Sequence, residues 1–212
     1  MIALVHGKNN DCHTKLLDNM FQLRAKVFAD RLGWDVNVKN GFERDRFDDI
    51  NPLYLLSIGS QGQLNGSLRL LPTTGPNMLT DVFSKILDKG DEVRSPLIWE
   101  SSRFCVSDNA GAERSDNRLN YTTGELLAGL CEVGMKAGLQ SIVTVYDARI
   151  KRVVRIAGCS GIEIGTPTKF GKVTAYAGLF PTDEVMLSSI KDAAGITGSV
   201  LSGDTTMLQV AA

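Results

Sequence analysis

The first regular pattern of hydrophobic and polar residues along the chain is helical. Four apolar residues recur at steps of three and four, so that they share one face. This spacing predicts a helix over about residues 14–31, with Gly33 as its stop signal. The stretch 40–51 is polar and dense in charges of both signs, and we expect a loop there. The apolar face consists of Leu16, Met20, Leu23 and Val27.

The middle of the chain has the pattern of strands. Residues 53–59 and 64–71 are apolar runs of strand length, and the short segment between them, with a glycine at each end, predicts a hairpin. A short helix is expected at 79–88. The run 97–106 is expected to be a central strand.

Strands and helices alternate in the second half of the chain. Hairpins followed by this alternation indicate a mixed α/β sandwich. We expect one domain over residues 1–180 and a C-terminal segment, 181–212, that packs on it and is frayed at its end. The expected elements are helices at 119–138 and 147–157 and strands at 141–146, 161–165 and 172–178.

Composition and charge exclude several classes of protein. The 212 residues are 43% hydrophobic and 22% charged, which is ordinary for a globular protein, and the net charge of −1 argues against a general nucleic-acid binder. No apolar run approaches the roughly 18 residues of a membrane span, and the start of the chain lacks a signal-peptide pattern, so we expect a cytoplasmic protein.

Common catalytic and metal-binding motifs are missing from the sequence. The four cysteines form no C-x-x-C motif and there are only two histidines, so we expect no metal site and mostly buried, reduced thiols. Neither G-x-S-x-G, G-x-G-x-x-G nor a P-loop is present. Hydrolase, dinucleotide-binding and nucleotide-triphosphate chemistry are therefore poor interpretations.

The first of three candidate groups combines a cation with two aromatic rings. Arg24 and Phe28 are four residues apart and share a helix face, and Trp34 follows shortly after. This combination suits a ligand with an anionic end and a flat ring. It also fits an ordinary amphipathic helix with an arginine at its rim and aromatic rings in the core, and spacing alone favours that reading.

The second group is Asp45-x-x-Asp48, within the mixed-charge run 43–49. Such a loop can organise a positively charged substrate or bind arginines elsewhere in the fold. It can equally be a solvated loop whose surface ion pairs contribute under about 1 kcal/mol each. Arg69, a lone charge among leucines, is a candidate partner for Asp45, Asp48 or Glu100.

The third group is Glu100 and Arg103 in the apolar run 97–106. A carboxylate in a low-dielectric cleft has a raised pKa and can act as a general base, while a buried Glu100–Arg103 structural pair is the alternative. Positions 100 and 103 point to opposite faces of a regular strand. Both can face one cleft only if the strand is bulged or ends there.

Taken in order along the chain, these groups resemble one family, the acyl-homoserine-lactone synthases, which are the LuxI-type autoinducer synthases of quorum sensing. The resemblance covers roughly residues 15–180. It implies a three-layer α/β/α sandwich, a GNAT-like acyltransferase fold with a mixed central sheet. The motifs that carry it are Leu23-Arg24-x-x-x-Phe28, Gly33-Trp34-Asp35-Val36, Asp45-x-x-Asp48, Arg69-Leu70-Leu71 and Glu100-Ser101-Ser102-Arg103-Phe104.

The resemblance also implies the reaction. The amine of S-adenosylmethionine attacks an acyl thioester, and the methionyl carboxylate then displaces the sulfonium, which closes a lactone and releases methylthioadenosine. S-adenosylmethionine is a substrate, so no cofactor is expected. The implied residues are Glu100 as catalytic base; Arg24, Phe28, Trp34, Arg103 and Phe104 as the S-adenosylmethionine pocket; and Asp45, Asp48 and Arg69 as a charge network that orders the N-terminal lid.

An acyl chain requires an apolar tunnel, although every residue proposed for it is equally suitable as ordinary core. In the family, a hydroxyl residue at the position of Thr144 accompanies 3-oxo-acyl donors, because it can hydrogen-bond the C3 carbonyl. A buried threonine bonded to its own backbone is the alternative. The expected tunnel residues are Met78, Phe83, Leu126, Val143, Thr144 and Leu179.

The acyl donor is expected to be bound to acyl carrier protein, because the coenzyme-A pyrophosphate loop of acetyltransferases is not evident. Acyl carrier protein is acidic, and the basic helix at 147–157 is the implied docking surface, although it can also be a solvated face. The alternatives are a GNAT-like N-acyltransferase that uses acyl-CoA and a non-catalytic acyl- or adenosyl-binding module. The docking residues are Arg149, Lys151, Arg152 and Arg155.

Overall fold

The computed structural model describes residues 1–7, 13–89, 91–108, 110 and 119–202. The end of the C-terminal segment, which we expected to be frayed, lies outside the described residues from 203 onward. Among the described residues, no helix combines the length and the apolar character needed to cross a membrane.

One seven-stranded mixed sheet forms the middle of the molecule. Its strands lie in the order β1-β4-β5-β6-β7-β9-β8, and every neighbouring pair is antiparallel except β6 and β7, which are parallel. The predicted hairpin, the predicted central strand and the strand predicted at 141–146 are all present. The strands are β1 (Ile2–His6), β4 (Leu53–Ile58), β5 (Leu64–Pro72), β6 (Ile98–Val106), β7 (Ser141–Tyr146), β8 (Ile162–Phe170) and β9 (Val173–Pro181).

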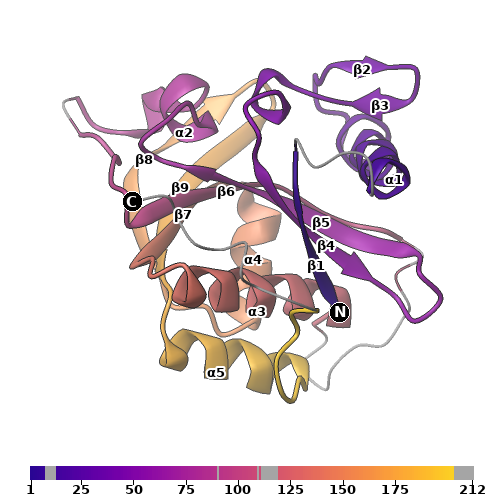
Figure 1. Cartoon of the computed structure of the whole chain (residues 1–212). Coiled ribbons are helices and arrows are strands. Elements are labelled where there is room, and N and C mark those ends of the chain that lie inside the picture. Colours follow the sequence, from indigo (N-terminus) through magenta and orange to yellow (C-terminus); the bar gives the residue numbers. More distant parts are fainter. Residues whose placement is uncertain (8–12, 90, 109, 111–118, 203–212) are drawn as a thin grey trace.

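Helices cover both faces of this sheet, so the molecule has three layers (Figure 1). On one face α3 and α5 pack over the main apolar core, and on the other α1 packs on residues of β1 and β4. The expected three-layer α/β/α sandwich with a mixed sheet is confirmed. The helices are α1 (Thr14–Arg24), α2 (Met78–Asp81), α3 (Tyr121–Lys136), α4 (Ala148–Ile156) and α5 (Glu184–Ala194).

The predicted first helix is present, but its second half is wound as a π-helix. α1 continues directly into the segment η1 (Ala25–Arg31), in which the Leu32 N–H donates to the Val27 carbonyl, five residues back. Gly33, with φ +63°, follows as the predicted stop.

Five elements were not predicted, and three of them are short segments in or beside the expected loop at 40–51. β1 lies at one edge of the sheet. On its outer side, the Ile2 N–H donates to the Val200 carbonyl and the Ser202 N–H donates to the Ile2 carbonyl. α5 packs so closely on α3 that a Cβ at Gly124 would lie 2.3 Å from that of Ala194. The expected loop at 40–51 contains the short strand β3 (Phe42–Glu43), which pairs with β2 (Val38–Lys39), and the 3-10 turn η2 (Arg46–Asp48).

The parallel strands β6 and β7 separate part of the way along the sheet. Their pairing ends at Ser101 and Thr144, yet β6 continues to Val106 beside β5 and β7 continues to Tyr146 beside β9. Beyond that point the backbone groups of β6 and β7 that face each other are not paired across the two strands. This separation positions the candidate site.

Candidate functional site

An ion-pair cluster, which we call the charge network, lies on the α1 side of the sheet. It contains three guanidinium groups and three carboxylates, so its formal charges balance. Elements far apart in sequence contribute to it, from α1 to β6. Its members are Arg24, Arg69, Arg103, Glu43, Asp45 and Asp48.

Asp48 is at the centre of the charge network. Its carboxylate accepts hydrogen bonds from Arg24 at 2.8 and 3.0 Å and from Arg69 at 2.8 Å, and the Tyr54 hydroxyl donates to it at 2.7 Å. Both arginines are 0% exposed. Burial alone would raise the pKa of Asp48, but the two guanidinium groups hold it well below its usual range. The carboxylate is therefore ionised at neutral pH.

Two further carboxylates connect Arg103 to this centre. Glu43 accepts from Arg24 at 2.5 Å and pairs with Arg103 at 3.1 Å. Asp45 pairs with Arg103 at 2.7 Å and accepts from Arg69 at 2.6 and 3.0 Å. Asp45 is the most accessible of the three carboxylates, with 17% of its side chain exposed, so the charge network has one acidic edge open to solvent.

Local backbone geometry explains the Asp45-x-x-Asp48 spacing. Asp45 caps η2 by accepting from the Phe47 N–H, and the Asp48 carboxylate accepts from the Asp45 N–H at 2.8 Å. This reciprocal arrangement is a capping box, which requires acceptor side chains three residues apart. The loop therefore binds arginines from elsewhere in the fold, which was one of the interpretations offered for it. Arg69 bonds Asp45 and Asp48, two of its three candidate partners.

Glu43 was not singled out from the sequence, although it is 0% exposed and bonds two arginines. It stands next to charged residues such as Arg44 that are solvated, and the run carries no periodic signal that distinguishes them. Its ion pairs with Arg24 and Arg103, which are far away in the sequence, hold it in the interior.

Glu100 lies at the N-terminus of α2 and is 1% exposed. Its carboxylate accepts from the backbone N–H of Met78 at 2.8 Å and from that of Leu79 at 2.5 Å. Burial raises the pKa of Glu100 to about 7, although the two N–H donors and the nearby Arg69 and Arg103 act against that rise. The carboxyl group can therefore take up or release a proton near neutral pH, which suits a general base.

A bulge in β6 places Arg103 on the same side as Glu100. Two residues of β6, Arg103 and Phe104, stand opposite the single residue Leu68 of β5, and Arg103 has a left-handed backbone with φ +54°. The predicted condition for both charges to face one side, a bulged strand, is confirmed. Glu100 bonds backbone rather than Arg103, so the alternative of a simple structural pair between them is not what forms.

The bulge also separates residues that the sequence grouped together. Phe28 and Trp34 stack with ring centroids 5.3 Å apart, and the Arg103 guanidinium lies 5.5 Å above the Phe28 ring. Phe104 faces the opposite side of β6, where it packs in the main core. Arg24 belongs to the charge network and not to the aromatic pair.

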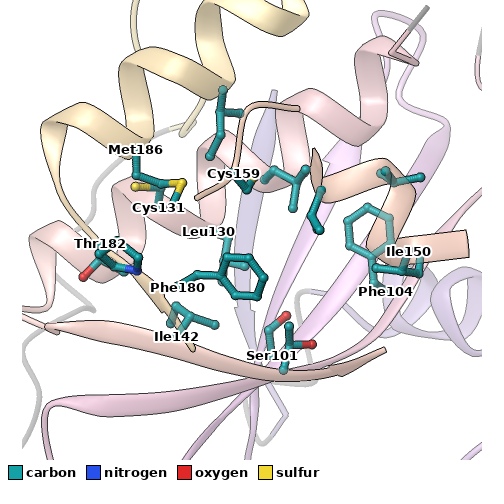
Figure 2. Close-up of a pocket in the computed structure, with 16 residues that line it drawn as sticks. Ser101, Phe104, Leu130, Cys131, Ile142, Ile150, Cys159, Phe180, Thr182 and Met186 are labelled. Carbon is teal, nitrogen blue, oxygen red and sulfur yellow. The ribbon is translucent and has the colours of Figure 1, made fainter. Parts of the chain in front are cut away.

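A mostly apolar cavity of about 70 Å³ occupies the side of β6 opposite Glu100 (Figure 2). It opens where β6 and β7 separate, since Ser101 and Thr144, their last paired residues, both line it. Strands β6, β7 and β9 and helices α3, α4 and α5 all contribute to its wall. Its other lining residues are Phe104, Leu127, Leu130, Cys131, Ile142, Ile150, Val153, Val154, Cys159, Phe180, Pro181, Thr182, Met186 and Ile190.

Of the six expected tunnel residues, Thr144 lines this cavity and the other five lie elsewhere. Val143 precedes Thr144 on a strand and therefore points to the other face, where it packs with Phe83 and Leu179. Met78 contacts the guanidinium groups of Arg69 and Arg103 through its sulfur, at 3.3 Å from each.

Leu126 is the remaining member of that set, and it lies in the core between α3 and the sheet. The face of α3 on which each leucine lies explains the difference. Leu127 and Leu130 are three residues apart and share the face that lines the cavity, whereas Leu126 lies on another face. The apolar pattern of the helix contains all three leucines, so it did not distinguish the cavity-lining pair from Leu126.

The basic helix α4 presents three exposed arginines and one engaged lysine. Arg149, Arg152 and Arg155 recur every third residue and are exposed. Lys151 instead pairs with Glu163 at 2.5 Å and lies 4.4 Å from the ring centroid of Tyr176. A groove of about 390 Å³ beside α4 shares Val154, Cys159 and Phe180 with the apolar cavity.

In the part of the chain that the structure describes, no group of three or more His, Cys, Asp or Glu side chains could hold a metal ion. The expectation that no metal or cofactor takes part in the reaction stays a prediction.

Comparisons with known proteins show which family the chain resembles. Residues 8–190 match the model of a family described as autoinducer synthase. An acyl-homoserine-lactone synthase from Agrobacterium fabrum is 39% identical to the chain over 189 residues, which is 89% of this chain and 90% of the relative.

Two solved structures share the fold. The acyl-homoserine-lactone synthase LasI is 30% identical with a TM-score of 0.76, and the match covers 91% of this chain and 95% of LasI. BjaI, described as a CoA-dependent acyl-homoserine lactone synthase and solved with SAM and isopentyl-CoA, is 25% identical with a TM-score of 0.83, over 96% of this chain and 93% of BjaI. The expected fold family is confirmed by these similarities.

Proposed function

The chain belongs to the autoinducer synthase family and is an acyl-homoserine-lactone synthase of quorum sensing; from this premise we propose that its chemistry takes place where β6 and β7 separate. S-adenosylmethionine binds on the side of Glu100 and the charge network, and the acyl chain occupies the apolar cavity on the other side. The observation that carries the proposal is the bulge in β6. Within residues 100–104 it turns Glu100 and Arg103 to one side and Ser101 and Phe104 to the other.

Each part of the adenosyl substrate has a matching group in the described residues. The stacked rings of Phe28 and Trp34, with Arg103 above the former, suit a flat purine and an anionic carboxylate. The accessible carboxylate of Asp45 suits a sulfonium. Arg24 acts in this proposal as a positioning residue, because its guanidinium is fully buried against Glu43 and Asp48.

The first step forms the amide. Glu100 takes a proton from the ammonium group of the substrate, directly or through a water molecule, and the free amine attacks the thioester carbonyl. Backbone N–H groups beyond Ser101 and Thr144, where β6 and β7 no longer pair with each other, are the proposed donors to the tetrahedral oxyanion. The C–N bond forms, the C–S bond breaks, and the thiol of the carrier leaves with a proton.

The second step closes the lactone. The methionyl carboxylate attacks the carbon bonded to the sulfonium, so that a C–O bond forms, the C–S bond breaks and methylthioadenosine is released. Proximity drives this intramolecular step, provided that the carboxylate is held in position. Arg103 is the proposed holder, since its guanidinium lies over the aromatic pair at the edge of the charge network.

The proposed acyl donor is acyl carrier protein, docked on the exposed arginines of α4. A CoA thioester is the second candidate, because the solved relative BjaI is described as CoA-dependent. The free thiols of Cys105, Cys131 and Cys159 support a cytoplasmic location, where thiols stay reduced.

The proposed reaction is tested by incubating the protein with S-adenosylmethionine and a panel of acyl thioesters on both carriers. Methylthioadenosine and an N-acyl homoserine lactone, identified by mass spectrometry, are the expected products. The absence of lactone from every donor would overturn the proposal. Tight CoA binding without any response to S-adenosylmethionine would favour a different N-acyltransferase.

Arg152→Glu is expected to raise the KM for the carrier-protein thioester about tenfold at low salt. It places a negative charge in the middle of the exposed arginine stripe, where an acidic partner would approach. The KM for S-adenosylmethionine should stay unchanged. Steady-state kinetics at two salt concentrations measures this, with Lys15→Glu on α1 as a control of equal charge change. If both variants behave alike, α4 is not the docking surface.

Thr144→Val is expected to lower the preference for 3-oxo-acyl over unsubstituted acyl donors by roughly 2–10-fold, the range for one net hydrogen bond. Thr144 lines the cavity at the end nearest the reaction centre, so its hydroxyl can reach the C3 oxygen of a bound chain. Competition between the two donors in one reaction gives the ratio directly. An unchanged ratio would assign the hydroxyl to its own backbone.

A further inference from the structure

The apolar cavity extends along β7. Ser101 and Thr144 line its entrance, and Ile142 lies two residues back along the same face of the strand. Thr182 lines the far end, and its N–H donates to the carbonyl of Gln140. Thr144 is four residue steps along the chain from Gln140, so the cavity extends roughly 13 Å away from the entrance.

The far end is closed by the first turn of α5 and the facing turn of α3. Asp183 caps α5 by accepting from the Met186 N–H at 2.8 Å, and its carbonyl lies 3.6 Å from the Cys131 sulfur. Cys131 and Met186 are each 4% exposed, and both line the cavity. Figure 2 shows Ser101 at one end of the cavity and Cys131 and Met186 together at the opposite end.

α5 is held close to the cavity, because both the helix and Thr182, the residue before its cap, pack tightly on α3. A Cβ at Gly124 would lie 2.3 Å from the Ala194 Cβ, and one at Gly134 would lie 2.4 Å from Thr182 Cγ2. Thr182 precedes Met186 in the sequence and Ala194 follows it, so the segment that carries Met186 is packed on α3 at both ends. A rigid end wall limits the length of the acyl chain that can bind, whereas a mobile wall would accommodate chains of different length.

We infer that Met186, with Cys131 opposite it, forms the end wall of the acyl site and limits the length of the acyl chain that the enzyme accepts. The inference rests on the proposed function, because it takes the apolar cavity to be the acyl site. The chain enters between Ser101 and Thr144 with its carbonyl at the reaction centre. Its terminal methyl group reaches the Met186 thioether.

Met186→Ala is expected to shift the acyl-length profile toward longer chains. It removes three side-chain atoms from the end wall, which leaves room for about two more carbons. Burying each methylene favours binding by a factor of about four, so the ratio of lactones two carbons longer to the lactones preferred by the wild type should rise roughly tenfold. Cys131→Leu fills the same end and should lower that ratio.

The assay is a competition among carrier-protein thioesters of different length, with the product lactones measured by mass spectrometry. Because the readout is a ratio within one sample, it does not depend on the amount of folded enzyme. Leu187→Ala is the matched control, since Leu187 is buried on the same helix but does not line the cavity. Met186→Val provides a milder truncation if the alanine variant does not fold.

Three results are possible, and they separate this inference from the proposed function. A longer profile in Met186→Ala with an unchanged profile in Leu187→Ala supports the end wall. Lactone production with the same profile in Met186→Ala, or an equal shift in both variants, overturns the end wall and leaves the proposed function standing. Lactone from no donor, even with wild-type enzyme, overturns the proposed function and the end wall with it.

Discussion

Glu100→Gln is expected to lower the turnover of lactone formation by about 10²–10⁴-fold, the usual contribution of a general base. The substitution keeps the size of the side chain but cannot accept a proton from the substrate ammonium. The proposed S-adenosylmethionine contacts, Phe28, Trp34 and Arg103, stay in place. Binding of S-adenosylmethionine, measured by calorimetry, should therefore change far less than turnover.

The pH profile gives an independent readout of the same role. Because burial raises the pKa of Glu100 to about 7, kcat/KM of the wild type should rise with pH through about 7 and then level off as the carboxylate forms. The Glu100→Gln variant should lack this rise. A purely structural role at the N-terminus of α2 would lower stability without changing the shape of the profile.

The control for Glu100→Gln is Glu132→Gln. Glu132 is also a buried glutamate, but it bonds Lys191 and Ser199 at a distance from the charge network. The Glu132→Gln variant should lose some stability but keep the turnover and the pH profile of the wild type. Unchanged turnover in Glu100→Gln would remove this residue as the base.

Asp48→Asn is expected to lower the free energy of unfolding by about 3–5 kcal/mol, the cost of removing one partner from a buried ion pair. The variant leaves Arg24 and Arg69, both fully buried, without their shared carboxylate. For a chain of this length, such a loss corresponds to a fall in Tm of roughly 10 °C. Chemical denaturation and thermal unfolding measure both quantities.

The neighbouring substitution Asp49→Asn is the matched control. Asp49 makes an ion pair with Arg44, but 73% of its side chain is exposed, so its loss should change stability by less than about 1 kcal/mol. Equal stability of the two variants would show that the charge network does not hold the fold together.

The contribution of Asp48 also depends on pH, with a definite sign. The fold lowers the pKa of Asp48, because Arg24 and Arg69 stabilise its ionised form more than burial opposes it. Its stabilisation is therefore fully present above the pKa of an unfolded aspartate, about 4, and is lost as the pH falls below that value. The stability difference between wild type and Asp48→Asn should shrink in acid.

Sequence patterns predicted the elements whose structure depends on residues close together in the chain. The period of the first helix, the hairpin at β4 and β5, and the β-branched strand β7 were all predictable from residues close in sequence. The need for a bulge also followed from sequence, because Glu100 and Arg103 cannot share a side of a regular strand. Arg69 was recognised as a lone charge among leucines, and Asp45 and Asp48 in a mixed-charge loop were named among its candidate partners.

Predictions failed where a partner distant in sequence decides the outcome. Leu126 and Leu127 are equally apolar, and only the packing of α3 on the sheet shows which one lines the cavity. Glu43 is buried by its arginine partners and not by any feature of its own run. α5 was missed although its buried apolar residues recur at helical spacing between the Asp183 cap and Gly195. In the structure, α5 packs closely against Gly124 of α3.

The two-sided use of β6 has a consequence for how signals diversify among bacteria. In the proposed mechanism, the groups that activate the amine and position the sulfonium lie on one side of residues 100–104, while the end of the acyl cavity lies roughly 13 Å along β7 on the other. Substitutions at that end would not touch the reacting atoms. On this proposal, one or two substitutions in α3 or α5 change the autoinducer that a bacterium makes without ending its production, so that a population changes which neighbours receive its signal.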